Sequence, residues 1–133
     1  MLIRRIQRSW ESWRGRAIEP VVRDAVLRIA PELGWPDVEQ VGGWWNRQNN
    51  PEVDLIGADR PEVARRVVFA GSIKWHETKR FDDHDHHMLV REATAVPGFD
   101  ENTDLVAVSR GGFAPSLPVR QIGPTDLVEA WQQ

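Results

Sequence analysis

The stretch VVFAGSIKW, residues 67–75, carries the strongest β-strand signal in the chain. It opens with valine, phenylalanine and alanine, a composition that favours a strand buried within a sheet. Because side chains on a strand alternate between its two faces, Ser72 and Lys74 are expected to project from the same face. We therefore predict that residues 67–75 form the central strand of the fold.

The segments around this strand predict the remaining elements. Their signals are apolar residues at helical or alternating spacing, bounded by turns rich in glycine and proline. In chain order we expect a helix over residues 16–30, strands over 38–46 and 52–58, a helix over 82–96, a strand over 105–108 and a helix over 125–131. Thr125 is the expected N-cap of the last helix. This order is typical of an α/β fold with a mixed central sheet.

Length and composition predict a single domain. The chain has 133 residues, 41% of them hydrophobic, which is enough for one core and too few for two ordinary ones. We expect an N-terminal connector helix over residues 1–14 and a core over residues 15–133. The connector is indicated by apolar residues at helical spacing, which are Leu2, Ile3, Ile6, Trp10 and Trp13.

Charge and composition narrow the class of protein. The formal net charge is −3, so any DNA contact requires a local basic patch. The chain has no cysteine, which excludes disulfides, thiolate zinc sites and cysteine nucleophiles. No apolar run reaches the roughly 18 residues needed to span a bilayer, and a cytoplasmic protein is expected. Arginine supplies 15 of the 17 basic residues, so Lys74 and Lys79 are the only lysines.

Three short motifs resemble those of the PD-(D/E)XK nuclease superfamily. They are GRAIE at residues 15–19, EVDLI at 52–56 and SIKW at 72–75. In that superfamily the first helix carries a glutamate, the second strand an aspartate and the third strand a Glu-X-Lys. The resemblance extends over residues 15–108 and implies a restriction-endonuclease-like αβββαβ core with a mixed sheet flanked by helices.

A narrower resemblance is to a family of uncharacterised domains, DUF234, found as the C-terminal part of archaeal-type P-loop ATPases. It is carried by GWWNR at residues 43–47, EVD at 52–54 and GSIKW at 71–75, the last of which commonly reads GECKW in that family. The resemblance implies the ATPase portion of a parent protein as a partner, with DNA as a second expected contact. This chain has no GxxxxGK(S/T) motif, so we do not expect it to bind ATP through a P-loop.

The same resemblance implies a Mg²⁺ site beside a lysine. Asp54 would be the principal metal ligand, Glu19 an outer or bridging ligand, and Lys74 the residue that stabilises the phosphate. Mg²⁺ prefers oxygen ligands, polarises a phosphodiester and helps to generate hydroxide. A lysine beside it can steady the charge that develops on the phosphate.

Ser72 departs from the family pattern, because it stands where the glutamate of Glu-X-Lys belongs. A neutral hydroxyl is a poor substitute for an anionic ligand, so weak Mg²⁺ binding is expected. Glu52, on the same strand face as Asp54, and Glu77 are the candidates for a relocated carboxylate. We therefore expect a domain that cleaves weakly or not at all.

Simpler structural roles compete with these assignments. Taken singly, Asp54 could be a solvated strand residue and Lys74 an exposed edge residue, while Glu19 favours the dipole of its helix in any case. Trp45 and Arg47 could stack on a base or seat a partner, although a core or hairpin role is favoured for both adjacent tryptophans, Trp44 and Trp45.

The cluster DDHDHH at residues 82–87 is a rival site, since aspartate and histidine together suit a transition metal. On a helix, however, His84 and His86 lie about 200° apart and cannot share one ion. Aspartates in a first turn are favoured by the helix dipole, so the start of a helix is the better explanation.

The sequence is compatible with three functions. The first is a nuclease-fold domain of an ATPase that regulates it or contacts DNA without efficient cleavage. The second is an active Mg²⁺-dependent DNA endonuclease with a relocated carboxylate. The third is a protein-interaction module, which would show no DNA affinity even at low salt.

Overall fold

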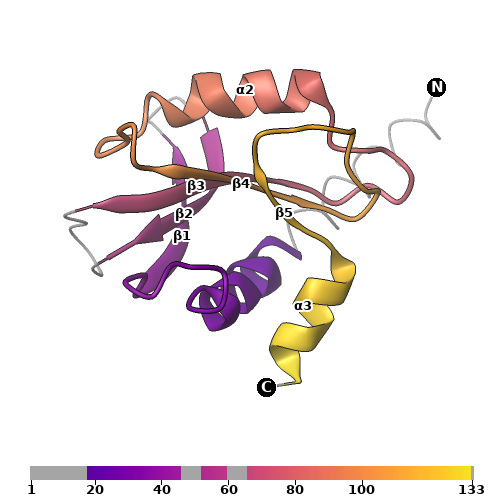
Figure 1. Cartoon of the computed structure of the whole chain (residues 1–133), viewed down its shortest axis with the longest axis horizontal. Helices are drawn as coiled ribbons and strands as arrows, with labels where there is room; N and C mark the ends of the chain where they lie inside the picture. The colour runs from indigo at the N-terminus through magenta and orange to yellow at the C-terminus, as the bar shows by residue number, and fades with distance from the viewer. Residues whose placement is uncertain (1–17, 46–51, 60–65, 133) are drawn as a thin grey trace, which may run out of the picture.

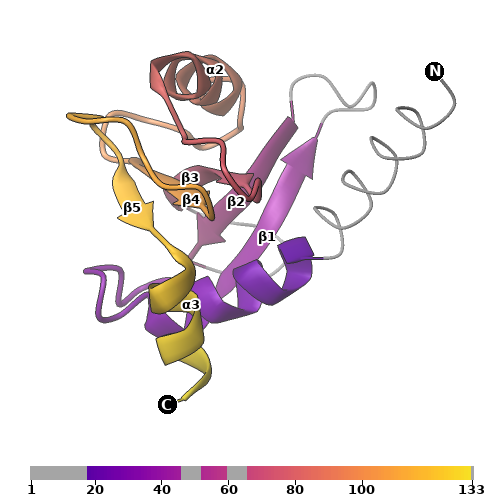
Figure 2. The same cartoon turned by 90° about the vertical axis from the view of Figure 1, so that its right-hand side faces the viewer.

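The computed structural model describes residues 18–45, 52–59 and 66–132. A five-stranded sheet lies between two layers of helices (Figure 1). The first helix, over residues 18–29, and the C-terminal helix α3 lie on one face of the sheet, and α2 lies on the other (Figure 2). The expected α/β class with a mixed sheet flanked by helices is confirmed, and the arrangement is consistent with a nuclease-like core.

The sheet has the strand order β1-β2-β3-β4-β5. Strands β1, β2 and β3 pair antiparallel, whereas β4 pairs parallel with β3 and β5 parallel with β4. The central position of β3 confirms the prediction made from residues 67–75. The strand bounds are Gln40–Trp45 for β1, Glu52–Ala58 for β2, Val67–Lys74 for β3, Asp104–Ser109 for β4 and Arg120–Ile122 for β5.

The helices begin and end close to the expected residues. Helix α2 spans Asp83–Ala93, with Asp82 as its N-cap, and α3 spans Pro124–Trp131. The prediction of Thr125 as the N-cap of α3 is wrong, because Gly123 holds that position. Pro124 lacks an N–H and suits the first helical turn, and Asp126 accepts a 2.8 Å hydrogen bond from the Gly123 N–H.

Two layers of apolar contacts hold the helices to the sheet. The layer under the first helix and α3 is the larger, and its fully buried members include Val22, Val26, Leu55, Phe69, Val106 and Ile122. On the other face, α2 packs through Leu89 and Ala93. These contacts fix β2, β3 and α2 against one another, which positions the polar cleft described below.

Several sequence expectations fall outside the described residues. These are the connector over residues 1–14 and Arg47. The backbone of Trp45, the last residue of β1, is described, but its side chain is not. Within the described ranges, no helix combines the length and apolar character needed to cross a membrane.

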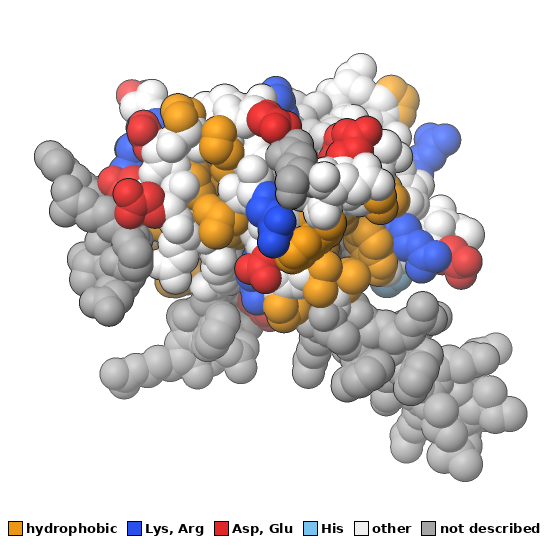
Figure 3. Space-filling model, turned by 90° about the horizontal axis from the view of Figure 1, so that it is seen from below, with side chains coloured by type: hydrophobic (Ala, Val, Ile, Leu, Met, Phe, Trp, Pro, Cys, Tyr) orange, Lys and Arg blue, Asp and Glu red, His pale blue; other side chains and the backbone are white. Residues whose placement is uncertain are grey.

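The face formed by the first helix and α3 exposes hydrophobic side chains among scattered charges (Figure 3). Val21, Val128 and Trp131 are exposed by 45%, 57% and 44%. The Arg28 guanidinium lies 4.1 Å from the centre of the Trp131 ring, a cation–π contact.

Candidate functional site

A polar cleft of about 480 Å³ lies where β2 begins and β3 ends, and residues of α2 also line it. Helix α2 crosses over this face of the sheet (Figure 1). Because β2 and β3 are antiparallel, the first residues of β2 and the last residues of β3 share one end of the sheet. The cleft is lined by Glu52, Asp54, Ser72, Lys74, Lys79, His84, Asp85, Met88, Leu89 and Glu92. The structure thus brings Asp54, Ser72 and Lys74 together, with Glu52 beside them.

Asp54 ties β2 to β3 through its side chain. Toward the cleft, the registered pairing of the two strands ends at Leu55 and Gly71. One residue further, Oδ2 of Asp54 accepts a 2.9 Å hydrogen bond from the backbone N–H of Ile73. The carboxylate therefore links the two strands beyond their last registered pair.

The pKa of Asp54 is raised above its usual value, chiefly because burial penalises its charged form. The neighbouring Glu52 carboxylate raises it further, while the Ile73 hydrogen bond and the charges of Lys74 and Arg23 act in the opposite direction. Desolvation outweighs these stabilising contacts. The surroundings of Asp54 thus favour its charged form less than water does.

Lys74 is paired with a residue of α2. Its Nζ lies 3.8 Å from Oδ1 of Asp85, whose side chain is 7% exposed. The other oxygen of Asp85 accepts a 3.0 Å hydrogen bond from the Asp82 N–H, and Asp82 Oδ1 accepts one of 3.0 Å from the Asp85 N–H. These reciprocal bonds form a capping box that fixes the first turn of α2.

The cluster at residues 82–87 is confirmed as a helix start. Asp82 caps α2, and Asp83 and Asp85 lie in its first turn. His84 and Asp85 line the cleft. Asp85 therefore combines the expected structural role with a contact to Lys74 that the sequence alone did not indicate.

Glu92 lines the cleft from α2 and was not anticipated from the sequence. Its pKa is raised, first by burial and next by the nearby charge of Asp54. No motif includes Glu92, but it follows His84, Asp85, Met88 and Leu89 at the three- and four-residue spacing of one helix face. That spacing is a signal from which its position over the cleft could have been inferred.

Glu19 does not lie among the residues that line the cleft. On the first helix, Glu19 Oε2 lies 3.3 Å from Nη2 of Arg23, and Arg23 Nε donates a 3.0 Å hydrogen bond to the backbone carbonyl of Asp54. Glu19 is thus linked indirectly to β2, because its partner Arg23 binds the backbone carbonyl of Asp54.

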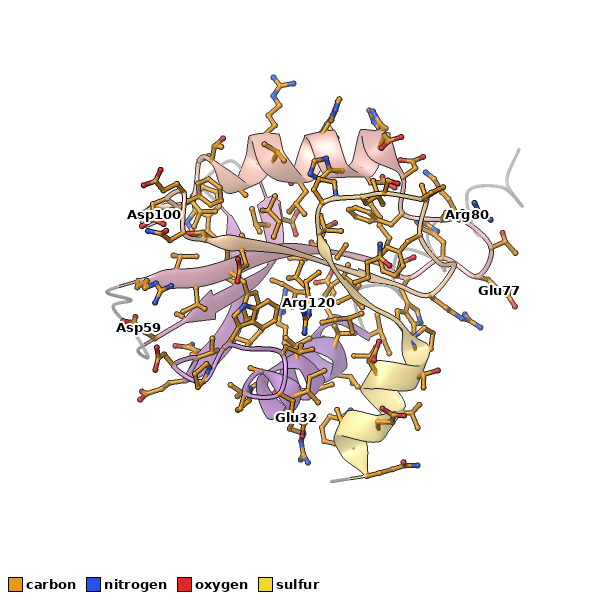
Figure 4. The ribbon with its side chains drawn as sticks, viewed as in Figure 1. Glu32, Asp59, Glu77, Arg80, Asp100 and Arg120 are labelled. Carbon is orange, nitrogen blue, oxygen red and sulfur yellow. The ribbon has the colours of Figure 1, made fainter. Side chains whose placement is uncertain are left out.

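The two candidates for a relocated carboxylate have different positions. Glu52 lines the cleft beside Asp54. Glu77 lies in the loop between β3 and α2, with its side chain 80% exposed and 3.9 Å from Arg110, at the edge of the molecule (Figure 4). Glu77 is not among the residues that line the cleft.

Both lysines of the chain line the same cleft. The loop that carries Lys79 is held by the segment after β4, because Phe81 exchanges backbone hydrogen bonds of 2.9 Å with Gly112 and Ala114. Gly111 approaches the backbone of Lys79 so closely that a Cβ there would clash with the Lys79 carbonyl. Lys79 therefore belongs to a fixed loop beside the cleft.

The cleft contains groups that could bind a metal ion. Four carboxylates and two lysines line it, so hard oxygen donors are present. Over the described part of the chain, however, no three His, Cys, Asp or Glu side chains are grouped closely enough to hold a metal ion. The described residues do not form a preassembled metal centre.

Comparison with known proteins gives one family. Residues 1–87 match the family model DUF234, described as "Archaea bacterial proteins of unknown function". No curated protein and no solved structure gives a significant match. The matched region includes Asp54, Ser72, Lys74 and Asp85 of the cleft, and covers more than half of the chain. The chain belongs to the DUF234 family.

Proposed function

We propose that this chain is a PD-(D/E)XK-like domain of a P-loop ATPase that does not cleave DNA efficiently and instead has a regulatory role or contacts nucleic acid. The observation that supports this most directly is the state of the cleft. Asp54 and Lys74 meet there, but Ser72 stands at the position of the expected carboxylate. Each of the two charged groups already has a partner within the protein.

The chemistry of these contacts argues against efficient hydrolysis. A metal-dependent nuclease needs anionic ligands that converge on a cation and a positive group free to meet the phosphate. In this cleft Asp54 is hydrogen-bonded to Ile73, and Lys74 is paired with Asp85. A serine hydroxyl adds no negative charge to hold Mg²⁺. In this proposal the domain keeps a nuclease-like fold without the full set of ligands that cleavage requires.

Metal titration tests the proposal through Ser72. The Ser72 side chain lines the cleft with Asp54 and Lys74, so Ser72→Glu would place a carboxylate beside Asp54. We expect calorimetry to show weak Mn²⁺ or Mg²⁺ binding by the wild type and tighter binding by Ser72→Glu. Ser72→Gln, which has the same size without the charge, is the matched control.

Two results would contradict the proposal. One is tight Mg²⁺ binding by the wild-type domain that is lost in Asp54→Ala. The other is equal metal affinity of Ser72→Glu and Ser72→Gln when both variants show the unfolding transition of the wild type. The first result would mean that the metal site is not weak, and the second that Ser72 is not the reason for its weakness.

A second candidate is an active endonuclease in which Glu92 supplies the missing carboxylate. It is favoured by the position of Glu92 over the cleft and by its electrostatic interaction with Asp54 and Glu52. This function predicts DNA nicking that requires Glu92. Loss of nicking in Glu92→Gln, with no loss in the exposed-loop variant Glu77→Gln, would favour it over the non-cleaving function.

The exposed face of the first helix and α3 supports the regulatory part of the proposal. Val21, Val128 and Trp131 present apolar surface on the side of the sheet opposite α2. A partner such as the ATPase portion could bind there without blocking the cleft. Val128→Glu is expected to weaken such an association and to leave metal binding unchanged.

A further inference from the structure

The ion pair between Lys74 and Asp85 joins the cleft to the first turn of α2. Nζ of Lys74 lies 3.8 Å from Oδ1 of Asp85, whereas Oδ2 of Asp85 accepts the capping hydrogen bond from Asp82. The two oxygens of one carboxylate thus serve two different partners. At 3.8 Å the contact is ionic and longer than a direct hydrogen bond, so Lys74 can leave without breaking the cap.

The two members of this pair differ in their access to solvent. The Asp85 side chain is 7% exposed and the Lys74 side chain 38% exposed. Burial of a carboxylate is unfavourable unless the group is paired or hydrogen-bonded. Asp85 keeps its capping hydrogen bond whether or not Lys74 is paired with it. The Lys74 ammonium, in contrast, can reach an anion that enters the cleft from solvent. Lys79 lines the same cleft and offers a second cation.

We propose that Asp85 competes with nucleic-acid phosphate for Lys74 and thereby holds the cleft in a state of low affinity. This inference rests on the proposed nucleic-acid contact. A phosphate and a carboxylate are both oxyanions, and an ammonium that balances one is less available to the other. Release of Lys74 from Asp85 therefore opens a phosphate-binding position between β3 and α2.

Lysine acylation tests the contact itself. Since Lys74 and Lys79 are the only lysines, mass mapping after brief treatment with an amine-selective ester reports each of them separately. Asp85→Asn keeps an oxygen for the Asp82 N–H and removes the charge. We expect this substitution to speed acylation of Lys74 by about threefold and to leave the acylation rate of Lys79 unchanged. A threefold change corresponds to the free energy that a partly exposed ion pair typically contributes.

Asp83→Asn is the matched control, because Asp83 is exposed in the same helical turn and does not line the cleft. It makes the same change in net charge without touching the pair. An acylation rate of Lys74 that is unchanged in Asp85→Asn, or that rises equally in Asp83→Asn, would overturn the proposal.

Nucleic-acid affinity tests the competition. With a fluorescent single-stranded oligonucleotide, Asp85→Asn should bind about threefold more tightly than the wild type. Its plot of log affinity against log salt should steepen by about one phosphate contact. The double variant Asp85→Asn/Lys74→Gln should lose the gain.

Equal oligonucleotide affinity of the wild type, Asp83→Asn and Asp85→Asn would overturn the competition, even if acylation shows that the ion pair exists. Efficient DNA cleavage by the wild type would instead overturn the proposed non-cleaving function and leave the acylation result standing. The two failures are therefore distinguishable.

Discussion

The carboxylate of Asp54 on β2 accepts a 2.9 Å hydrogen bond from the backbone N–H of Ile73 on β3, just beyond the last registered pair of the two strands. The bond gives Asp54 a structural role in addition to any role in binding. The same carboxylate has a raised pKa because burial disfavours its charge. The hydrogen bond that Asp54 accepts therefore stabilises the fold, whereas the buried charge of Asp54 destabilises it.

Asp54→Asn is expected to raise the urea midpoint of unfolding at neutral pH, because the amide oxygen can still accept from Ile73 and the desolvated charge is gone. Asp54→Ala should be less stable than Asp54→Asn by about 1–2 kcal/mol, the cost of an unsatisfied amide. Glu101→Gln, an exposed acid in the loop before β4, controls for the change in net charge.

The raised pKa of Asp54 determines how the stability difference between Asp54→Asn and the wild type depends on pH. The folded-state pKa of Asp54 lies above the unfolded value of 3.8, so the folded protein binds the proton more tightly. The wild type therefore loses stability as pH rises from 3.8 through the raised pKa. The advantage of Asp54→Asn should be greatest at neutral pH and vanish below pH 3.8, and a constant advantage at all pH values would contradict this cause.

The pKa of Asp82 is shifted in the opposite direction to that of Asp54. Its pKa is lowered, first by the hydrogen bond from the Asp85 N–H, so its contribution to stability is present above 3.8 and is lost as pH falls through the folded-state pKa. Asp82→Ala should lower the urea midpoint at pH 7 more than Asp83→Ala does. Urea titrations at successively lower pH should show the Asp82→Ala deficit shrinking below 3.8; a deficit that grows there would refute the role of the charged cap.

Gly71 is required by close packing of β3 against β4. A Cβ at this position would clash with a methyl group of Val106 and lie 2.6 Å from the Val106 carbonyl oxygen, which belongs to the backbone and cannot move aside. Gly71→Ala should destabilise the fold by about 1–3 kcal/mol in urea denaturation, as overpacking does. Gly42→Ala is the control, because no atom of the described residues beyond its own chain neighbours lies within 4 Å of its Cβ position. An equal loss of stability in both variants would contradict the packing argument.

Much of the fold follows from local patterns in the sequence. The bounds of β2 agree with the expected strand, and β3 and α2 begin within one residue of their expected starts. The expectation failed to include β5, whose three residues are stabilised by parallel pairing with β4 rather than by an apolar run of their own. Such non-local pairing leaves little trace in a single sequence.

The candidate site shows the same division between local and tertiary information. Alternation along the strands placed Ser72 with Lys74, and the motifs placed Asp54 near them. Asp85 and Glu92 reach the cleft only because α2 crosses over the strand ends, and Glu19 is held by Arg23 on the first helix. The positions of these three side chains depend on how helices dock on the sheet, which spacing along the chain does not specify.

Nicking of supercoiled plasmid by the purified wild-type domain in Mg²⁺ or Mn²⁺ tests the central claim most directly, with Asp54→Ala as the matched control. The non-cleaving account predicts that the wild type leaves the plasmid supercoiled, as Asp54→Ala does. Metal-dependent nicking by the wild type that disappears in Asp54→Ala would contradict it.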